Sequence, residues 1–187
     1  MNKKIIFSLI FLNLFWAGAA FFYDLKTILH IPFYLWPFLV VCPVYPMLLA
    51  FVWHNILTKN KIDQFLLSFS AIASLTYFLA ALIYYPVWMV VNNFDWLALG
   101  QIFWVGFYGL QGIYLLKKYR IGEQKMILVW FFLAVSFFID LLTKTYGYLD
   151  FSNISDQLLA IGLILVLFLS LSISVYLNKN TPISSQI

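Results

Sequence analysis

The sequence predicts an all-α protein: a polytopic transmembrane helical bundle of about six spans, forming a single integral membrane domain over residues 1–187. Three observations predict it, namely the composition, a series of apolar runs between short polar turns, and the placement of the basic residues. The chain is 64% hydrophobic and 10% charged, whereas soluble domains are about 45–50% apolar and about 25% charged. A globule of this size cannot hide that much apolar side chain from water, so we expect the lipid bilayer to be the solvent.

Six apolar runs supply the predicted spans. At roughly 20 residues per crossing, six spans and their loops use most of the chain. The first run follows Lys3-Lys4 and is longer than the roughly 7–15-residue apolar core of a signal peptide, so we interpret it as an uncleaved helix. The predicted spans cover approximately residues 5–23, 43–57, 65–90, 96–116, 126–143 and 158–177.

Four prolines interrupt the apolar sequence between the first two spans: Pro32, Pro37, Pro43 and Pro46. Proline lacks a backbone donor and clashes with the preceding turn, so one straight helix is not expected here. We predict a proline-rich interfacial or re-entrant segment from Pro32 to Cys42. The second span then starts near Pro43, since a first helical turn tolerates both Pro43 and Pro46.

The basic residues fall on alternate sides of these spans. With a cytoplasmic N-terminus, nine of them lie on the cytoplasmic side and two, Lys26 and Lys144, lie outside. This positive-inside bias requires an even number of spans. We therefore predict a multi-pass protein of the prokaryotic cytoplasmic (cell) membrane with both termini cytoplasmic. The cytoplasmic basic residues are Lys3, Lys4, Lys59, Lys61, Lys117, Lys118, Arg120, Lys125 and Lys179.

Several function classes lack their sequence motifs. Cys42 is the only cysteine, which excludes an intrachain disulfide and a thiolate metal cluster. The sequence contains no phosphate-binding glycine loop, no HExxH and no GxGxxG. Its basic residues do not form the aromatic-interleaved patch that binds nucleic acid. We expect no cofactor, no bound metal and no nucleic acid partner.

Asp140 is the most suggestive candidate for a binding residue. It follows Phe137-Phe138-Ile139 in an apolar run, where a carboxylate costs about 2.5–3.5 kcal/mol at a helix centre unless it is paired or hydrated. One interpretation is a contact to a cation, proton or substrate in an outward-facing cavity. The other is an interfacial carboxylate paired with Lys144, four residues later on the same helix face.

Asp24 and His30 are predicted at the same outer level as Asp140. Carboxylates and imidazole together suit a metal or proton site. The spacing forms no dense motif, so the alternative is a set of separate, solvated loop residues.

The predicted fourth span carries Gly106, Gly109 and Gly112 at three-residue intervals, with Gln101 and Gln111 beside them. Small residues at this spacing let a neighbouring helix approach closely. The two glutamines either bond across that interface or line a cavity. Asn13 in the first span is expected to make another interhelical hydrogen bond.

Short segments spread over most of the chain are similar to those of a known family. They are Asn13-Leu14, Phe22-Tyr23, Ile31-Pro32, Pro43-Val44-Tyr45-Pro46, Val105-Gly106 through Gln111-Gly112, and Phe137-Phe138-Ile139-Asp140. In these segments the chain resembles the YpjA-like family of small polytopic prokaryotic membrane proteins of unknown function. The resemblance implies the same helical membrane fold.

The chain is degenerate at the polar positions of that family pattern. Where the pattern has an acid after the first proline of Pro-x-x-Pro, this chain has Val44. Where the pattern has a histidine and a glutamate in the fourth span, this chain has Val105 and Gln111. Where the pattern has an additional acid before the one that corresponds to Asp140, this chain has Phe137. The resemblance thus implies the fold and argues against a catalytic or metal site.

The leading functional hypothesis is a non-enzymatic membrane protein. It binds or transports a small or lipidic ligand through an outward-facing cavity, with Asp24, His30, Gln101, Gln111 and Asp140 as candidate ligand-binding residues. One alternative is an intramembrane enzyme that modifies a lipid or isoprenoid, although such chemistry normally needs several convergent acids, bases or metal ligands. The other is a structural subunit whose glycine-lined helix docks against a partner membrane protein.

Overall fold

The computed structural model of the protein describes residues 2–30, 41–58, 62–143, 145–146 and 149–181. The described residues form six helices and one short ribbon of two antiparallel two-residue strands, in which Thr145 pairs with Asp150 and Tyr146 with Leu149. The all-α prediction is confirmed. The elements are α1 (Lys3–His30), α3 (Val41–Thr58), α4 (Gln64–Asn92), α5 (Trp96–Lys118), α6 (Glu123–Thr143), β1 (Thr145–Tyr146), β2 (Leu149–Asp150) and α7 (Asp156–Lys179).

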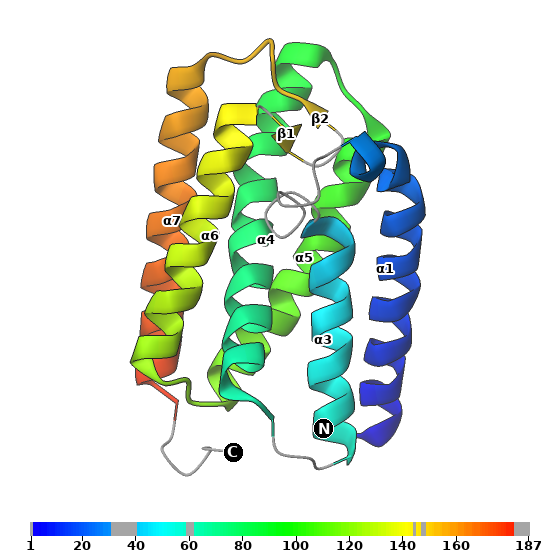
Figure 1. Ribbon diagram of the computed structural model, residues 1–187, viewed down its shortest axis with the longest axis vertical. Coiled ribbons are helices and arrows are strands. Elements are labelled where there is room, and N and C mark those ends of the chain that lie inside the picture. The colour runs from blue at the N-terminus through cyan, green and yellow to red at the C-terminus, as the bar shows by residue number, and fades with distance from the viewer. Residues whose placement is uncertain (1, 31–40, 59–61, 144, 147–148, 182–187) are drawn as a thin grey trace.

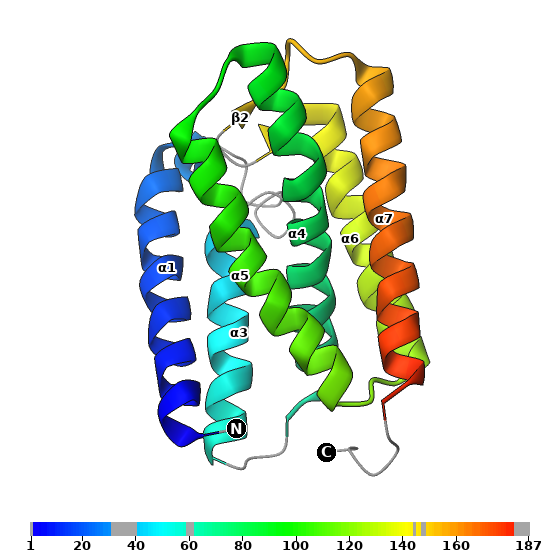
Figure 2. The same ribbon diagram turned by 180° about the vertical axis from the view of Figure 1, so that it is seen from behind.

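Five of the helices within the described residues are long and apolar enough to cross a membrane: α1, α4, α5, α6 and α7. The sixth helix, α3, has 18 residues, or about 27 Å at 1.5 Å per residue. Figures 1 and 2 show that α3 begins well short of the end that α1 and α4 reach. The predicted second span therefore corresponds to the shortest helix of the bundle.

The first helix is longer than the predicted span. We expected the first span to end near Tyr23, yet α1 continues to His30. Polar residues such as Asp24 and Lys26 end a stretch suited to hydrocarbon, but they do not end a helix. The sequence from Tyr23 to His30 contains neither Gly nor Pro, and the first proline, Pro32, disfavours helical geometry only in the residue before it.

The second predicted boundary shifts by two residues. α3 begins at Val41 rather than Pro43, which places Pro46 inside the helix instead of in its first turn. Pro46 cannot donate to the carbonyl four residues earlier, but a helix tolerates this loss near its start. Residues 32–40 of the predicted interfacial or re-entrant segment lie outside the described residues, while Val41 and Cys42 belong to α3.

Polar caps start three of the helices. The Asp63 carboxylate accepts from Leu66 N at 2.8 Å before α4, and the Asp95 carboxylate accepts from Leu97 N at 2.8 Å before α5. Ser155 Oγ accepts from Leu158 N at 3.4 Å before α7. Each cap satisfies a backbone N–H that has no partner inside its helix.

α4 is the central helix of the bundle, with α1 and α3 to one side of it and α6 and α7 to the other (Figures 1 and 2). It packs against α3, α5, α6 and α7. The closest approach is to the glycines of α5. A Cβ on Gly109 would lie 2.5 Å from Phe78 Cβ, and one on Gly112 would lie 2.5 Å from the Ala71 carbonyl oxygen. The predicted glycine face of α5 is thus covered by α4 of the same chain.

The outward surfaces of the helices are apolar. On α1, Phe7, Phe11 and Phe15 are more than half exposed, and α7 presents Ile164 and Phe168 in the same way. Rows of exposed apolar side chains such as these are rare on soluble monomers, whereas a bilayer requires them. The exposed surface agrees with the five membrane-length helices.

The helices alternate in direction, so α1 begins and α7 ends at the same end of the bundle (Figure 1). We call this the basic end, because seven basic and two acidic residues of the described chain lie there. They are Lys3, Lys4, Lys117, Lys118, Arg120, Lys125 and Lys179 against Asp63 and Glu123. The opposite end holds Asp24, Asp95, Asp150 and Asp156 with Lys26.

Candidate functional site

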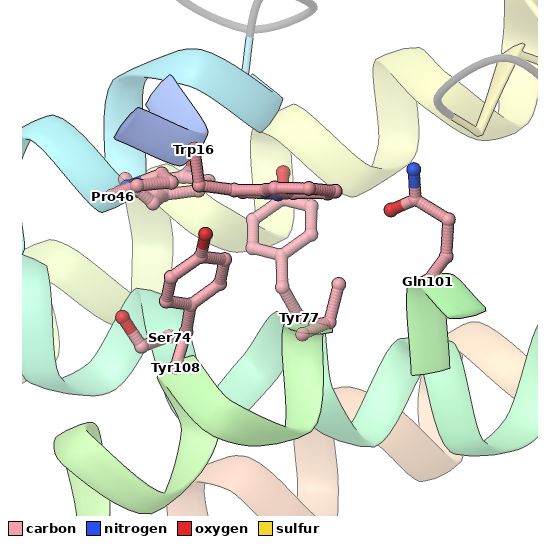
Figure 3. Close-up of a pocket in the computed structure, with 8 residues that line it drawn as sticks. Trp16, Pro46, Ser74, Tyr77, Gln101 and Tyr108 are labelled. Atoms are coloured by element: carbon pink, nitrogen blue, oxygen red, sulfur yellow. The ribbon is translucent and has the colours of Figure 1, made fainter. Parts of the chain in front are cut away.

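A cavity of about 40 Å³ lies between α1, α3, α4 and α5 (Figure 3). A water molecule needs roughly 10–15 Å³ measured this way, so the cavity has room for about three. Eight side chains from four helices line it: Trp16, Tyr45, Pro46, Ser74, Tyr77, Gln101, Val105 and Tyr108.

The cavity lies deep within the bundle. Ser74 and Tyr77 are near the middle of α4, and Trp16 and Tyr108 are near the middles of α1 and α5. If these helices cross a membrane, the cavity lies at the level of the hydrocarbon core rather than of the headgroups.

Two hydroxyl groups in the cavity lining, Ser74 Oγ and Tyr77 Oη, are buried. Ser74 Oγ has no hydrogen-bond partner within the described part of the chain, whereas Tyr77 interacts with the side chains of Tyr45 and Ser136. The Ser74 side chain is only 2% exposed. A buried polar group left without a partner costs about 1–3 kcal/mol. A water or ligand that bonds to Ser74 in the cavity would remove that cost, so the cavity is a candidate binding site.

Aromatic rings form most of the rest of the wall. The Trp16 ring stacks on Trp104 with centroids 4.2 Å apart, and the Tyr45 and Tyr77 rings have centroids 4.7 Å apart. Figure 3 shows Trp16 and Pro46 closing one side, with Tyr77 and Tyr108 directed toward that side from α4 and α5. None of the eight lining residues is Asp, Glu, Lys, Arg or His.

The two candidate glutamines have different positions. Gln101 lines the cavity. Gln111 instead joins a buried hydrogen-bond network in which its Oε1 accepts from Asn13 Nδ2 at 2.9 Å and from Trp53 Nε1 at 2.7 Å. Gln111 Nε2 in turn donates to Asn13 Oδ1 at 3.2 Å. This network ties α1 and α3 to α5, and it leaves Gln111 no role in the cavity wall.

Asp140 lies in the protein interior on α6, with 4% of its surface exposed. It does not line the cavity, but it is close enough to Tyr77 to act on the hydroxyl electrostatically. The Phe137 ring, one turn earlier on α6, lies 4.8 Å from the Tyr77 ring. Tyr77 thus lies between the cavity, which it lines, and Asp140. The alternative pairing with Lys144 concerns a residue outside the described chain.

The side chains of Asp24 and His30 also lie outside the described residues, although their backbones belong to the last turns of α1. Their convergence with Asp140 remains a prediction. Among the side chains that the structure does describe, no group of three or more His, Cys, Asp or Glu could hold a metal ion.

Most of the cavity wall was not evident from the sequence, which gave no reason to single out Trp16, Ser74 or Tyr77. One signal was present: Ser70, Ser74 and Tyr77 follow one another at four- and three-residue intervals, so they share one face of a helix. Single hydroxyls are common in apolar helices, however, and sequence does not show which of them lack partners.

Comparisons with protein-family models, with curated proteins and with solved structures find no match for this chain.

Proposed function

We propose that this protein is a non-enzymatic membrane protein that binds, and in doing so helps to move, a small or lipidic ligand in the cavity between α1, α3, α4 and α5. The observation that carries the proposal is the buried Ser74 hydroxyl, which belongs to the cavity lining and has no partner among the described residues; the Tyr77 hydroxyl belongs to the same lining. Ligand sites typically combine an apolar, aromatic wall with a few polar groups that fix orientation.

The size and lining of the cavity limit the ligand. Pockets that bind drug-sized molecules have volumes of about 300–1,000 Å³, far more than the volume of about 40 Å³ here, so only a compact group fits without movement of the helices. The uncharged lining favours a group that presents apolar surface to the rings and one or two polar atoms to Ser74, Tyr77 or Gln101. An amphipathic molecule, with the rest of its length outside the cavity, has this character.

The proposed access is from the end opposite the basic end. Tyr45 and Pro46 of the cavity lining come from the first turns of α3, which begins on that side of the bundle. With the basic end in the cytoplasm, as the positive-inside rule predicts, the cavity would open outward. This orientation, and residence in a prokaryotic cytoplasmic membrane, are part of the proposal.

The two alternatives have less support. The lining residues include no general acid, general base or metal ligand of the usual kinds, so an intramembrane enzyme would need groups from elsewhere. A structural subunit that docks through the glycines of α5 would need an uncovered glycine face, but Gly109 and Gly112 already contact α4.

Membership of the YpjA-like family is also a proposal. Two of the four positions at which this chain departs from the family pattern are at or near the cavity: Val105 lines it, and the Phe137 ring contacts the Tyr77 ring. This placement is what we expect if those two positions of the family pattern belong to one site whose polarity is reduced here.

The test is thermal unfolding of the purified protein in detergent with a panel of compact amphiphiles: fatty alcohols, isoprenols, lysophospholipids and choline-type compounds. A ligand that binds only the folded state raises its stability by about 2.7 kcal/mol at 100 times Kd. We expect at least one compound to raise the Tm of the wild type and not that of Val105→Trp, in which the indole fills the cavity.

The matched controls are two serines of α4. Ser70 and Ser74 are both buried hydroxyls without a partner in the described chain, but only Ser74 lines the cavity. Ser70→Ala should keep the full ligand-induced rise in Tm and Ser74→Ala should reduce it. The proposal is wrong if no compound changes the wild-type Tm, or if Val105→Trp, folded by its own melting curve, responds as the wild type does.

A further inference from the structure

The cavity wall has the composition of a cation-binding aromatic cage. Four of its eight residues are Trp16, Tyr45, Tyr77 and Tyr108. The face of an aromatic ring carries partial negative charge, and several rings around one space attract a compact, weakly hydrated cation. Methylated ammonium groups are such cations, because their methyl groups also replace water against the apolar ring surface.

The size of the cavity agrees with such a group. Room for about three waters corresponds to roughly 90 Å³ of liquid at about 30 Å³ each. That is the scale of a compact headgroup and not of a complete lipid. The hydrocarbon part of a larger ligand would therefore stay outside the cavity.

The charges around the cavity favour a cation over an anion. The described residues of the lining include no lysine, arginine or histidine, whereas they offer the oxygens of Ser74 and Tyr77 and the amide of Gln101. Asp140 is buried on α6 within electrostatic range of the Tyr77 hydroxyl. A buried cation is costly without a compensating charge, and a cation bound in the cavity would favour the ionised form of Asp140, which would then supply part of that charge.

We propose that the polar part of the ligand is a methylated ammonium group of the choline type, held between the rings of Trp16, Tyr77 and Tyr108. The oxygen that choline carries two carbons from its nitrogen would then hydrogen-bond with Ser74 or Tyr77. This inference rests on the binding function proposed above and names the chemical class of its ligand.

The experiment compares choline with 3,3-dimethylbutan-1-ol, in which a neutral carbon replaces the ammonium nitrogen in the same shape. Binding of each to the purified protein is measured by titration calorimetry in detergent. We expect choline to bind at least about tenfold more tightly, because only choline carries the charge that the rings attract.

Variants of individual tyrosines test whether choline binds in this cavity. Tyr108→Leu removes a ring from the cavity and should weaken choline binding, while Tyr108→Phe keeps the ring and should retain most of it. Tyr114→Leu is the matched control, since Tyr114 is on the same helix but outside the cavity lining. Asp140→Asn should weaken the binding of choline and leave that of the neutral alcohol unchanged.

The outcomes separate the two proposals. Equal affinity for choline and the neutral alcohol overturns the cation inference and leaves the binding function standing. The same holds if choline does not bind but another amphiphile of the panel does. If no compound binds, both proposals fail.

Discussion

At the scale of single residues, Gln111 holds three helices together. Its Oε1 accepts two hydrogen bonds, from Asn13 on α1 and Trp53 on α3, and all three side chains are at least 95% buried. Polar side chains between apolar helices act in this way because hydrocarbon offers them no other partner. Asn13 makes the interhelical bond expected of it, whereas its partners were not evident from sequence, because residues 13, 53 and 111 are far apart in the chain.

We predict that Gln111→Leu lowers the free energy of unfolding by about 1–2 kcal/mol. The estimate lies between the roughly 1–3 kcal/mol cost of a buried unpaired group and the roughly 0.6 kcal/mol average for interhelical bonds in membranes. Reversible unfolding in mixed detergent micelles measures it. Gln101→Leu is the control and should change the value less. Equal effects of the two variants would show that the network adds no stability.

Asn178 has a comparable role at the basic end. Its Oδ1 accepts from Ile121 N at 2.7 Å and its Nδ2 donates to Ile121 O at 2.9 Å, so the end of α7 holds the turn between α5 and α6. Asn178→Leu leaves both backbone groups of the buried Ile121 without these partners. We predict a loss of at least about 1 kcal/mol in the same assay.

Asn180→Ala tests whether the replacement of any asparagine near the end of α7 lowers stability in the same way. Asn180 is exposed and its amide bonds only to Tyr176 O, four residues earlier on its own helix. Its replacement should change stability by less than about 0.5 kcal/mol, as for most surface substitutions. A loss as large as that of Asn178→Leu would contradict the assignment.

At the scale of helices, composition predicted where the elements lie better than where they end. The apolar runs from residue 65 to 90 and from 96 to 116 correspond closely to α4 and α5, because Asp63 and Asp95 cap them at their starts. The end of α1 was missed by seven residues, since a hydropathy pattern reports suitability for lipid and not helicity. The β1–β2 ribbon was missed because two-residue strands leave no periodic pattern.

The glycines of α5 give a test of helix packing. A Cβ at Gly112 would lie 2.5 Å from the Ala71 carbonyl oxygen, which is backbone and cannot rotate away. Gly112→Ala should therefore cost about 1–3 kcal/mol, as overpacking does. Gly100→Ala is matched to it on the same helix, since nothing lies within 4 Å of a Cβ there. Thermal unfolding of both variants in detergent should show a lower Tm for Gly112→Ala only.

At the scale of the whole molecule, the basic residues of the described chain gather at the end where α1 begins and α7 ends (Figure 1). The sequence was sufficient to predict this, because charge alternates with the helices. The sequence was insufficient to predict the cavity, because four helices form it together and because it depends on how closely α4 approaches α5.

Reporter fusions at the two termini test this arrangement. We predict that both termini report a cytoplasmic location, and that a reporter placed at Asn93, in the turn between α4 and α5, reports the outer side. Termini on opposite sides would mean an odd number of crossings and would contradict the topology.

The most direct test of the central claim, that the cavity between α1, α3, α4 and α5 binds a ligand, is an experimental structure of the protein in lipid nanodiscs prepared with native lipids. We predict density in the cavity within hydrogen-bonding distance of Ser74 Oγ. A cavity closed by repacked side chains, with Ser74 bonded to the backbone of its own helix, would contradict the account.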